Sequence, residues 1–368
     1  MLRVIDYSEY NANEVYEFSF SLHTHCNLRC KFCFQDHTHD IDQYDISNII
    51  KRSRLDITTI LQDRAIKLIL VRMYGGELFS DDIPDEIFDE YHVFVRNLEE
   101  FIYCVRNDIK LVFYWGTNTV FTKRDRVKRL LESHTGFIAP SYDVVGRFIN
   151  KQQKDIWWET AEYFIQQKKL TSISIMLVKP CIEAYIHGDE YFEKIPENIW
   201  IDVNQYVPNL NYQEYLPSDD DIYNFYKWCI DTNHFNVEIL FNIINNMVEN
   251  ISFEHCFCKH SQFFSSNQIT KNCIYKYSNL SPDNFYHDDL IYNVSESNCN
   301  DINREIGLQK RGCFTCEHFK YCPKMCWTSI IGTIVQLSNQ CPYDRIYKYI
   351  EQNNNVLDNF IKFRQKII

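Results

Sequence analysis

Short apolar runs alternate with longer stretches of helical periodicity from residue 17 to about residue 205. The apolar runs predict strands, and the stretches between them predict helices. The expected strands are 17–22, 67–73, 110–115, 137–142, 172–178 and 199–206. The expected helices lie near 43–62, 84–105, 123–133, 153–168 and 182–194. Strand alternating with helix predicts right-handed crossovers and a parallel sheet.

Six such repeats are typical of a partial or full barrel, or of a doubly wound sheet. We expect an α/β fold, with a partial (β/α)6 TIM-like barrel followed by a small cysteine-rich domain. Two further helices are expected near 219–232 and 236–248. The expected organisation is an N-terminal extension (1–16), the barrel (17–215), a helical bridge (216–252), the cysteine-rich domain (253–345) and a C-terminal helix or tail (346–368).

Polar or cysteine-containing segments follow four of the expected strands. Cys26 follows the first strand, Gly75-Gly76-Glu77 the second and Gly116-Thr117-Asn118 the third, and Ser141-Tyr142-Asp143 closes the fourth. In barrels and in doubly wound sheets alike, ligands gather at the carboxyl ends of the strands. The sequence therefore predicts one rim at which all four segments meet.

Composition and charge narrow the classes of partner. A formal charge of -12 argues against tight binding to nucleic acid, which requires a positive surface. The N-terminus lacks the features of a signal peptide, and no apolar run approaches the ~20 residues of a membrane span. We therefore expect a cytoplasmic protein without a membrane partner. Its 15 cysteines are then thiols or metal ligands, because stable disulfides are rare in a reducing compartment.

Three cysteines, Cys26, Cys30 and Cys33, directly follow the first expected strand at the spacing C-x3-C-x2-C. Three thiolates can hold three irons of a 4Fe-4S cluster and leave the fourth iron without a protein ligand. A closed structural zinc site would need a fourth ligand instead. The nearby histidines that could supply it are His23, His25, His37 and His39. Spacing alone leaves both interpretations open.

The segment CNLRCKFC resembles the signature loop of the radical S-adenosylmethionine (SAM) enzymes. The resemblance implies a 4Fe-4S cluster whose open iron is chelated by the amino and carboxylate groups of SAM. It also implies reductive cleavage of SAM to a 5'-deoxyadenosyl radical, which abstracts a substrate hydrogen. Phe32 matches the aromatic position that leans towards adenine. Gly75, Gly76 and Glu77 resemble the Gly-Gly-Glu segment that hydrogen-bonds the methionyl amine of SAM.

Two more segments of the cofactor site follow from the same resemblance. Thr117 and Asn118 stand where many relatives carry a Thr-Asn-Gly segment, but Thr119 replaces the usual glycine. Arg147 is the candidate for the arginine that often meets the SAM carboxylate. The resemblance thus implies cofactor contacts at each of the first four strand ends.

Removal of a proton from the substrate requires a base that the sequence does not single out. Ser141 and Asp143 match a Ser-x-Asp segment that reaches the ribose or the substrate. Ile274 stands where sulfatase-maturating relatives place an Asp general base, and isoleucine cannot accept a proton. The candidate catalytic residues are therefore Asp143, Tyr142 and Tyr206.

The second group of cysteines contains the pattern C-x2-C-x5-C-x3-C between residues 313 and 326. This pattern resembles the SPASM extension, which binds two auxiliary 4Fe-4S clusters; a pair of zinc ribbons would also satisfy eight thiolates. By resemblance, the outer cluster is held by Cys313, Cys316, Cys322 and Cys341. The inner cluster is held by Cys256, Cys258, Cys273 and Cys326. The cysteine-rich domain is thus expected to be SPASM-like, and the expected cofactors are three 4Fe-4S clusters and SAM.

The resemblance implies an oxidoreductase that crosslinks or dehydrogenates a peptide or protein, as in the maturation of ribosomally made peptides. The first strand begins at residue 17, so we expect that a separate protein recognises any leader peptide, or that the substrate is small or is read by the barrel itself. An electron donor such as ferredoxin or flavodoxin is the other expected partner. The alternatives are a redox-neutral epimerase, a small-molecule dehydrogenase, and a non-catalytic iron-sulfur or zinc interaction protein. The intact Gly-Gly-Glu segment argues against the last.

Overall fold

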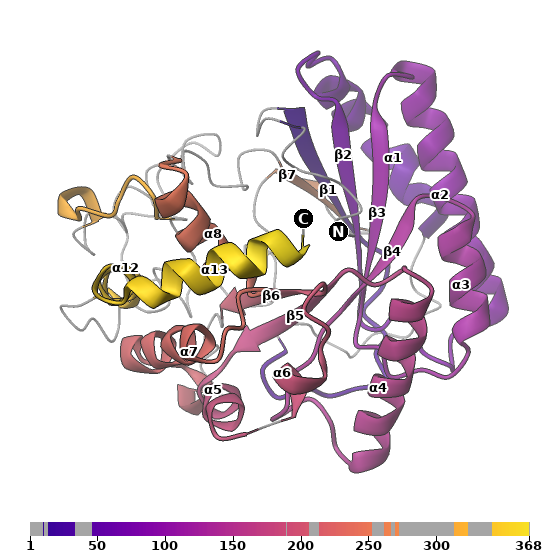
Figure 1. Cartoon of the computed structure of the whole chain (residues 1–368). Helices are drawn as coiled ribbons and strands as arrows, with labels where there is room; N and C mark the ends of the chain where they lie inside the picture. Colours follow the sequence, from indigo (N-terminus) through magenta and orange to yellow (C-terminus); the bar gives the residue numbers. More distant parts are fainter. Residues whose placement is uncertain are drawn as a thin grey trace.

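The computed structural model describes residues 10, 14–33, 46–188, 190–205, 213–251, 261–265, 269–271, 313–322 and 341–367 of the chain (Figure 1). The predicted site residues outside these ranges are Tyr206, Cys256, Cys258, Cys273 and Cys326. His37, His39 and Ile274 also lie outside them. The roles assigned to all of these residues stay predictions.

Six strands form where the apolar runs predict them. They are β1 (Val15–Ser21), β2 (Leu68–Tyr74), β3 (Lys110–Thr117), β4 (Gly136–Pro140), β5 (Ser172–Leu177) and β6 (Trp200–Gln205). Strands β1 to β4 pair in parallel in chain order, and β5 pairs in parallel with β6. Parallel bridges from Ile138 to Leu170 and from Ser141 to Ser174 connect the two sheets. The predicted α/β fold with a partial barrel of parallel strands is confirmed.

Helices follow the strands as expected, with one exception. The helices of the barrel are α1 (Ile46–Leu61), α2 (Asp85–Val105), α3 (Arg124–Glu132), α4 (Lys151–Gln166), α5 (Lys179–Ile186) and α6 (Tyr191–Lys194). The single helix expected near 182–194 is wrong, because α5 and α6 are separate. Between them Gly188 adopts φ +105°, a conformation that glycine tolerates and that interrupts a helix.

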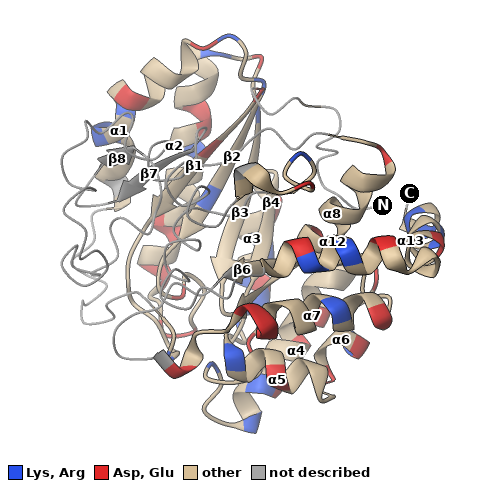
Figure 2. Cartoon of the chain, turned by 90° about the vertical axis from the view of Figure 1, so that its left-hand side faces the viewer, with Lys and Arg blue, Asp and Glu red and all other residues tan. Residues whose placement is uncertain are grey.

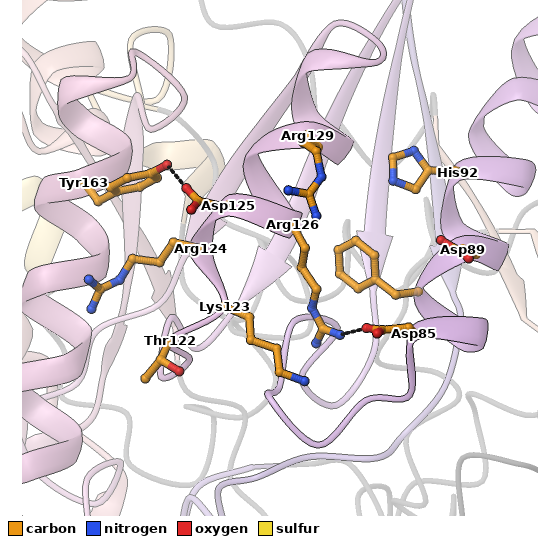
Figure 3. A pocket seen from close by; sticks show the side chains of 11 residues that line it. Asp85, Asp89, His92, Thr122, Lys123, Arg124, Asp125, Arg126, Arg129 and Tyr163 are labelled. Atoms are coloured by element: carbon orange, nitrogen blue, oxygen red, sulfur yellow. Dashed lines mark hydrogen bonds and ion pairs between the residues drawn. The ribbon is translucent and has the colours of Figure 1, made fainter.

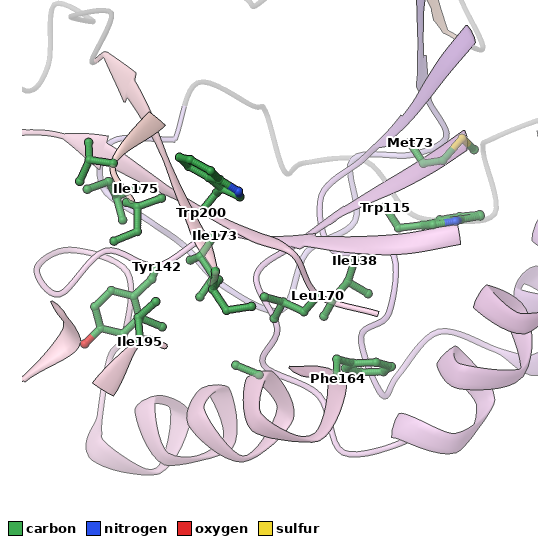
Figure 4. Packing of buried hydrophobic residues seen from close by; sticks show 14 of the residues in the cluster. Met73, Trp115, Ile138, Tyr142, Phe164, Leu170, Ile173, Ile175, Ile195 and Trp200 are labelled. Carbon is green, nitrogen blue, oxygen red and sulfur yellow. The ribbon is translucent and has the colours of Figure 1, made fainter. Parts of the chain in front are cut away.

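The main hydrophobic core lies between the outer face of the sheet and the helices. Alternate strand residues point to opposite faces, and Phe18, Val71 and Phe113 on the outer face are completely buried. Figure 4 shows Phe164 of α4 facing Ile138 across this layer. Burial of the outer face fixes the strand register, so the residues between these positions point to the inner face of the barrel.

The sheet continues beyond β1 into a segment that shows little periodicity. Strand β7 (Ser261–Ser265) pairs in parallel with β1, and β8 (Ile269–Lys271) pairs antiparallel with β7. The sheet order is therefore β4-β3-β2-β1-β7-β8. A segment expected to belong to the cysteine-rich domain is thus hydrogen-bonded to the first strand of the barrel.

The two C-terminal helices pack against the helices that follow the barrel. Helices α7 (Asp219–Asp231) and α8 (Glu238–Val248) lie beside α12 (Pro342–Gln352) and α13 (Asn354–Ile367). The ring of Phe360 packs 5.7 Å from Phe235 and 5.1 Å from Phe241 between ring centroids. Charges of both signs follow one another along α7 and α12 (Figure 2), and Arg345 contacts Asp220 at 2.5 Å. These contacts hold the segment that begins at Cys341 against α7 and α8.

Candidate functional site

The three N-terminal cysteines lie in the loop that leaves the carboxyl end of β1, and all three are partly buried. The Cys33 amide donates to the carbonyl of Cys30 at 3.0 Å, and the Leu28 amide donates to Cys26 Sγ at 3.4 Å. The Lys31 amide donates to the Gly146 carbonyl at 3.2 Å, which ties the loop to the segment after β4. Burial raises the pKa of the Cys26 thiol to about 12. Without a metal centre this sulfur therefore stays protonated.

The number of thiols in the loop suits a cluster with one open iron. A closed zinc site needs four ligands, whereas Cys26, Cys30 and Cys33 supply three thiols. Three thiolates can hold three irons of a 4Fe-4S cluster.

The Gly75-Gly76 turn after β2 runs directly beside the segment that precedes the cysteine loop. The Gly76 amide donates to the His23 carbonyl at 2.9 Å, and the Glu77 amide donates to the His25 carbonyl at 2.7 Å. A Cβ atom on Gly76 would lie 2.0 Å from the His25 carbonyl oxygen, and one on Gly75 would lie 2.9 Å from that of His23. Only glycine allows this approach, so the turn sets the position of Cys26.

Glu77 is fully buried and links β2 to β3. One carboxylate oxygen accepts from the Thr117 hydroxyl at 2.7 Å and from the Phe79 amide at 3.0 Å, and the other accepts from the Asn118 amide. Burial raises the pKa of Glu77 to about 7, and these three hydrogen bonds oppose the rise. A carboxylate has about four acceptor positions, so one remains for an ammonium group.

Asn118 joins the loop after β3 to the cysteine loop. Its amide donates to Asn27 Oδ1 at 2.7 Å and lies 3.8 Å from Cys26 Sγ, while Asn27 donates to the Val120 carbonyl at 2.7 Å. The next residue, Thr119, adopts φ +65°, the left-handed conformation that favours glycine. This left-handed backbone explains why the Thr-Asn-Gly segment of radical SAM relatives carries a glycine here. In this chain a buried threonine adopts the same conformation.

Asp143 and Arg147 form a buried ion pair beside the cysteine loop. Arg147 donates from Nε at 2.9 Å and from Nη2 at 2.5 Å to one oxygen of Asp143, whose other oxygen accepts from the Met176 amide at 2.7 Å. The guanidinium lies over the ring of Phe32 at 5.6 Å. Burial raises the pKa of Asp143, and Arg147 and the Met176 amide oppose that rise. Asp143 thus orients Arg147, and Arg147 keeps further N–H groups for a carboxylate.

The two remaining candidates after β4, Tyr142 and Ser141, lie in different surroundings. Tyr142 is completely buried against the helices: its ring stacks on Tyr191 with 4.3 Å between centroids and meets Trp157 edge-on at 4.7 Å. The structure therefore does not bring Tyr142 to the rim. Ser141 follows the strand end, where its amide donates to the Thr117 carbonyl at 2.9 Å, and so stands next to the third segment.

The two histidines before Cys26 already have partners. His23 is buried, and its Nε2 lies 2.7 Å from the hydroxyl of Tyr91. His25 Nε2 lies 3.0 Å from Asp82. Both rings therefore point to α2 and the loop before it, which weakens the zinc interpretation of this loop further.

The inner face of the barrel holds charged residues that the sequence analysis did not select. Arg72 donates to Glu17 at 2.7 Å and lies 6.0 Å from the ring centroid of Tyr114. Asp202 on β6 contacts Glu238 at the start of α8. Burial, and then the Glu238 carboxylate, raise the pKa of Asp202 well above its ordinary value, which Arg72 opposes. The only sequence signal of this contact was Asp202 itself, a charged residue within the otherwise apolar segment IWIDV.

Four cysteines of the second group lie in the described part of the chain, all partly buried: Cys313, Cys316, Cys322 and Cys341. Cys313 opens a short 3-10 helix, η8 (Cys313–Thr315), and Cys341 caps α12. A buried histidine, His318, lies between them and contacts Asp344 of α12. No motif in the sequence points to His318.

Two pockets lie near the carboxyl ends of the strands. One of about 610 Å³ adjoins the cysteine loop and is lined by Lys31, Lys179, Glu183, Glu214 and Tyr215, among others. Another of about 760 Å³ lies between α2 and α3, outside the cysteine site, and Figure 3 shows Lys123, Arg126 and Arg129 among the side chains that line it.

Solved structures supply the comparison, since neither a family model nor a curated protein matches the chain. The structure of anSMEcpe with bound AdoMet has 15% identity and a TM-score of 0.62, and the match covers 94% of this chain and 98% of that one. SuiB from Streptococcus suis has 19% identity and a TM-score of 0.52, with 86% and 74% covered. The fold shared with these two structures is the one that radical SAM proteins with SPASM-type relatives have. This chain has the radical SAM fold.

The radical SAM fold confirms the resemblance inferred from the motifs as far as architecture is concerned. A further structure of anSMEcpe contains AdoMet and Cp18Cys peptide, with 15% identity, a TM-score of 0.61, and 93% and 98% of the two chains covered. None of the helices in the described ranges is both long and apolar enough to span a membrane.

Proposed function

We propose that this chain is a radical SAM enzyme that oxidatively modifies a peptide or protein. The observation that carries the proposal is the junction of three strand ends. The Gly75-Gly76 turn, Asn118 and the Gly146 carbonyl all hydrogen-bond to the cysteine loop or to the residues just before it. In a chain with the radical SAM fold, this junction supports a cluster and SAM site at the rim.

Each part of the rim has a definite task in this proposal. Cys26, Cys30 and Cys33 hold the N-terminal cluster, and when bound the cluster and SAM supply a 5'-deoxyadenosyl radical. Arg147, oriented by Asp143, presents N–H groups to the carboxylate of SAM. Glu77 offers its remaining acceptor position to the ammonium group, an interaction worth roughly 1.5 to 3 kcal/mol. The glycine turn lets the backbone approach the ligand closely.

A peptide is the substrate class that we favour. Solved structures of similar fold include anSMEcpe with bound Cp18Cys peptide and SuiB bound to precursor peptide SuiA. Formation of a crosslink or double bond removes two electrons from the substrate in total, so a second electron acceptor is needed after the radical step. The eight thiols expected to hold two auxiliary 4Fe-4S clusters suit that task. A separate leader-recognition protein and a ferredoxin or flavodoxin complete the proposed set of partners.

The experiment combines iron analysis with SAM cleavage. The anaerobically reconstituted chain is expected to hold about twelve irons, from three 4Fe-4S clusters, and to form 5'-deoxyadenosine after reduction with dithionite. Replacement of Cys26, Cys30 and Cys33 by Ala should lower the iron content to about eight and abolish cleavage. Cleavage by this triple variant at the parent rate would refute the assignment.

The type of reaction is decided by the product. The substrate to test is a short precursor peptide sought among the neighbouring genes, and its product should weigh two hydrogens less than the peptide itself. A product of unchanged mass with a solvent-derived hydrogen at carbon would show epimerisation instead. Cys273→Ala should leave SAM cleavage largely intact and suppress the oxidised product.

A further inference from the structure

His318 stands at the centre of a compact group of ligand atoms on α12. Its Nδ1 lies 2.9 Å from Asp344 Oδ1, and Cys316 Sγ lies 3.5 Å from the same oxygen. The sulfur, the nitrogen and the oxygen all lie within 4.8 Å of one another. Among the residues that the structure describes, this is the one group of three such ligands so closely spaced.

The spacing matches a single metal ion. Two ligands of one tetrahedral zinc ion stand on the order of 3.3 to 3.6 Å apart, given bonds of ~2.3 Å to sulfur and ~2.0 Å to nitrogen or oxygen. The sulfur to oxygen separation of 3.5 Å falls in this range, and the nitrogen to oxygen separation of 2.9 Å needs only a small expansion. A 4Fe-4S cluster, by contrast, separates its ligands more widely.

The neighbours of His318 fix the orientation of its ring, as is usual for a histidine that binds a metal ion. A ligating histidine usually directs its second ring N–H to a carboxylate, which fixes the tautomer and the ring plane. His318 Nε2 lies 3.1 Å from Glu351 Oε1, and the ring stacks on Tyr347 with 4.7 Å between centroids and 7° between planes. Lys348 holds the other oxygen of Asp344 at 2.8 Å. His318 itself is 4% exposed.

We propose that Cys316, His318 and Asp344 bind one divalent metal ion of the zinc or ferrous class in the cluster-free chain. Thiolate, imidazole and carboxylate together suit these ions. Cys316 is also an expected ligand of the outer auxiliary cluster, so one mononuclear ion and that cluster exclude each other. This exclusion rests on the proposed function, whereas binding of the ion does not.

Cobalt(II) is the probe for the ion. The full-length chain, purified without cluster reconstitution, is titrated anaerobically with Co2+ and followed by absorption and proton NMR. We expect an exchangeable, strongly shifted imidazole N–H signal that His318→Gln removes and that Asp231→Asn, a change of an exposed acid on α7, leaves in place. Glu351→Gln should weaken Co2+ binding about 10- to 100-fold because it removes only the orienting carboxylate. An N–H signal that persists in His318→Gln, or no such signal in the parent, would overturn the proposal.

The exclusion is tested by loading order. Chain saturated with Zn2+ before reconstitution should take up about eight irons instead of about twelve, whereas Asp344→Asn treated in the same way should take up about twelve. Equal iron content with and without zinc in the parent would refute the exclusion. Cleavage of SAM, measured on the parent in parallel, tests the proposed function separately.

Discussion

Arg147 donates two hydrogen bonds to one oxygen of Asp143, and the Met176 amide occupies the other oxygen. The carboxylate that the sequence offered as a base is therefore engaged on both sides. Its geometry favours a role in orienting Arg147 over proton removal from a substrate.

Asp143→Asn separates these two roles. Loss of one partner from a buried ion pair leaves an uncompensated charge, so we expect a loss of about 3 to 5 kcal/mol in unfolding stability, together with weaker SAM binding. Urea unfolding and equilibrium dialysis of SAM measure the two effects. If SAM affinity were unchanged while only product formation fell, Asp143 would be the base after all.

Glu77 predicts a pH dependence of stability. Its pKa is about 7 in the folded chain and near its ordinary value when unfolded, so the native state binds the proton more tightly. The protonated carboxyl of Glu77 therefore contributes to the free energy of unfolding at low pH. This contribution, roughly 3 kcal/mol in total, is lost as the pH rises through about 7. Glu77→Gln should flatten this slope between pH 5 and pH 8. Parallel slopes for the two proteins in urea unfolding would contradict the prediction.

Gly76→Ala should disrupt the cysteine loop. The added Cβ would lie 2.0 Å from the His25 carbonyl oxygen, so the backbone before Cys26 must move. We expect loss of the N-terminal cluster, about four irons per chain, and of SAM cleavage. Gly116→Ala is the matched control, since its Cβ would meet the Met73 carbonyl at 3.2 Å, a much milder contact. Similar iron content in both variants would rule out this role of Gly76.

Thr119→Gly should stabilise the chain. A non-glycine residue in the left-handed conformation costs roughly 1 to 2 kcal/mol, and the buried Thr119 hydroxyl also has no hydrogen-bond partner. A rise in the thermal midpoint is the expected result. Asn233→Gly serves as the control, because Asn233 also has positive φ, at 61°, but asparagine tolerates this conformation. A midpoint no higher than that of the parent would contradict the strain argument.

The barrel could be predicted because the buried outer face of each strand requires apolar residues, which form short runs between the helical stretches. The rim could be predicted because glycines, cysteines and acids follow those runs directly. Strand β7 could not be predicted, since SQFFS is short and its partner β1 lies more than two hundred residues earlier. Asp202 was missed for a related reason: its neighbour Glu238 comes from another element, and no local pattern reveals such a contact.

The pairing of β7 with β1 has a consequence for synthesis of the chain. One edge of β1 stays uncovered until residues 261–265 have left the ribosome. An open edge of a strand is a template for pairing with other chains, and distant pairings form slowly. The nascent barrel thus exposes this edge while most of the polypeptide is being translated, and chaperone supply during expression should govern the yield of the native chain.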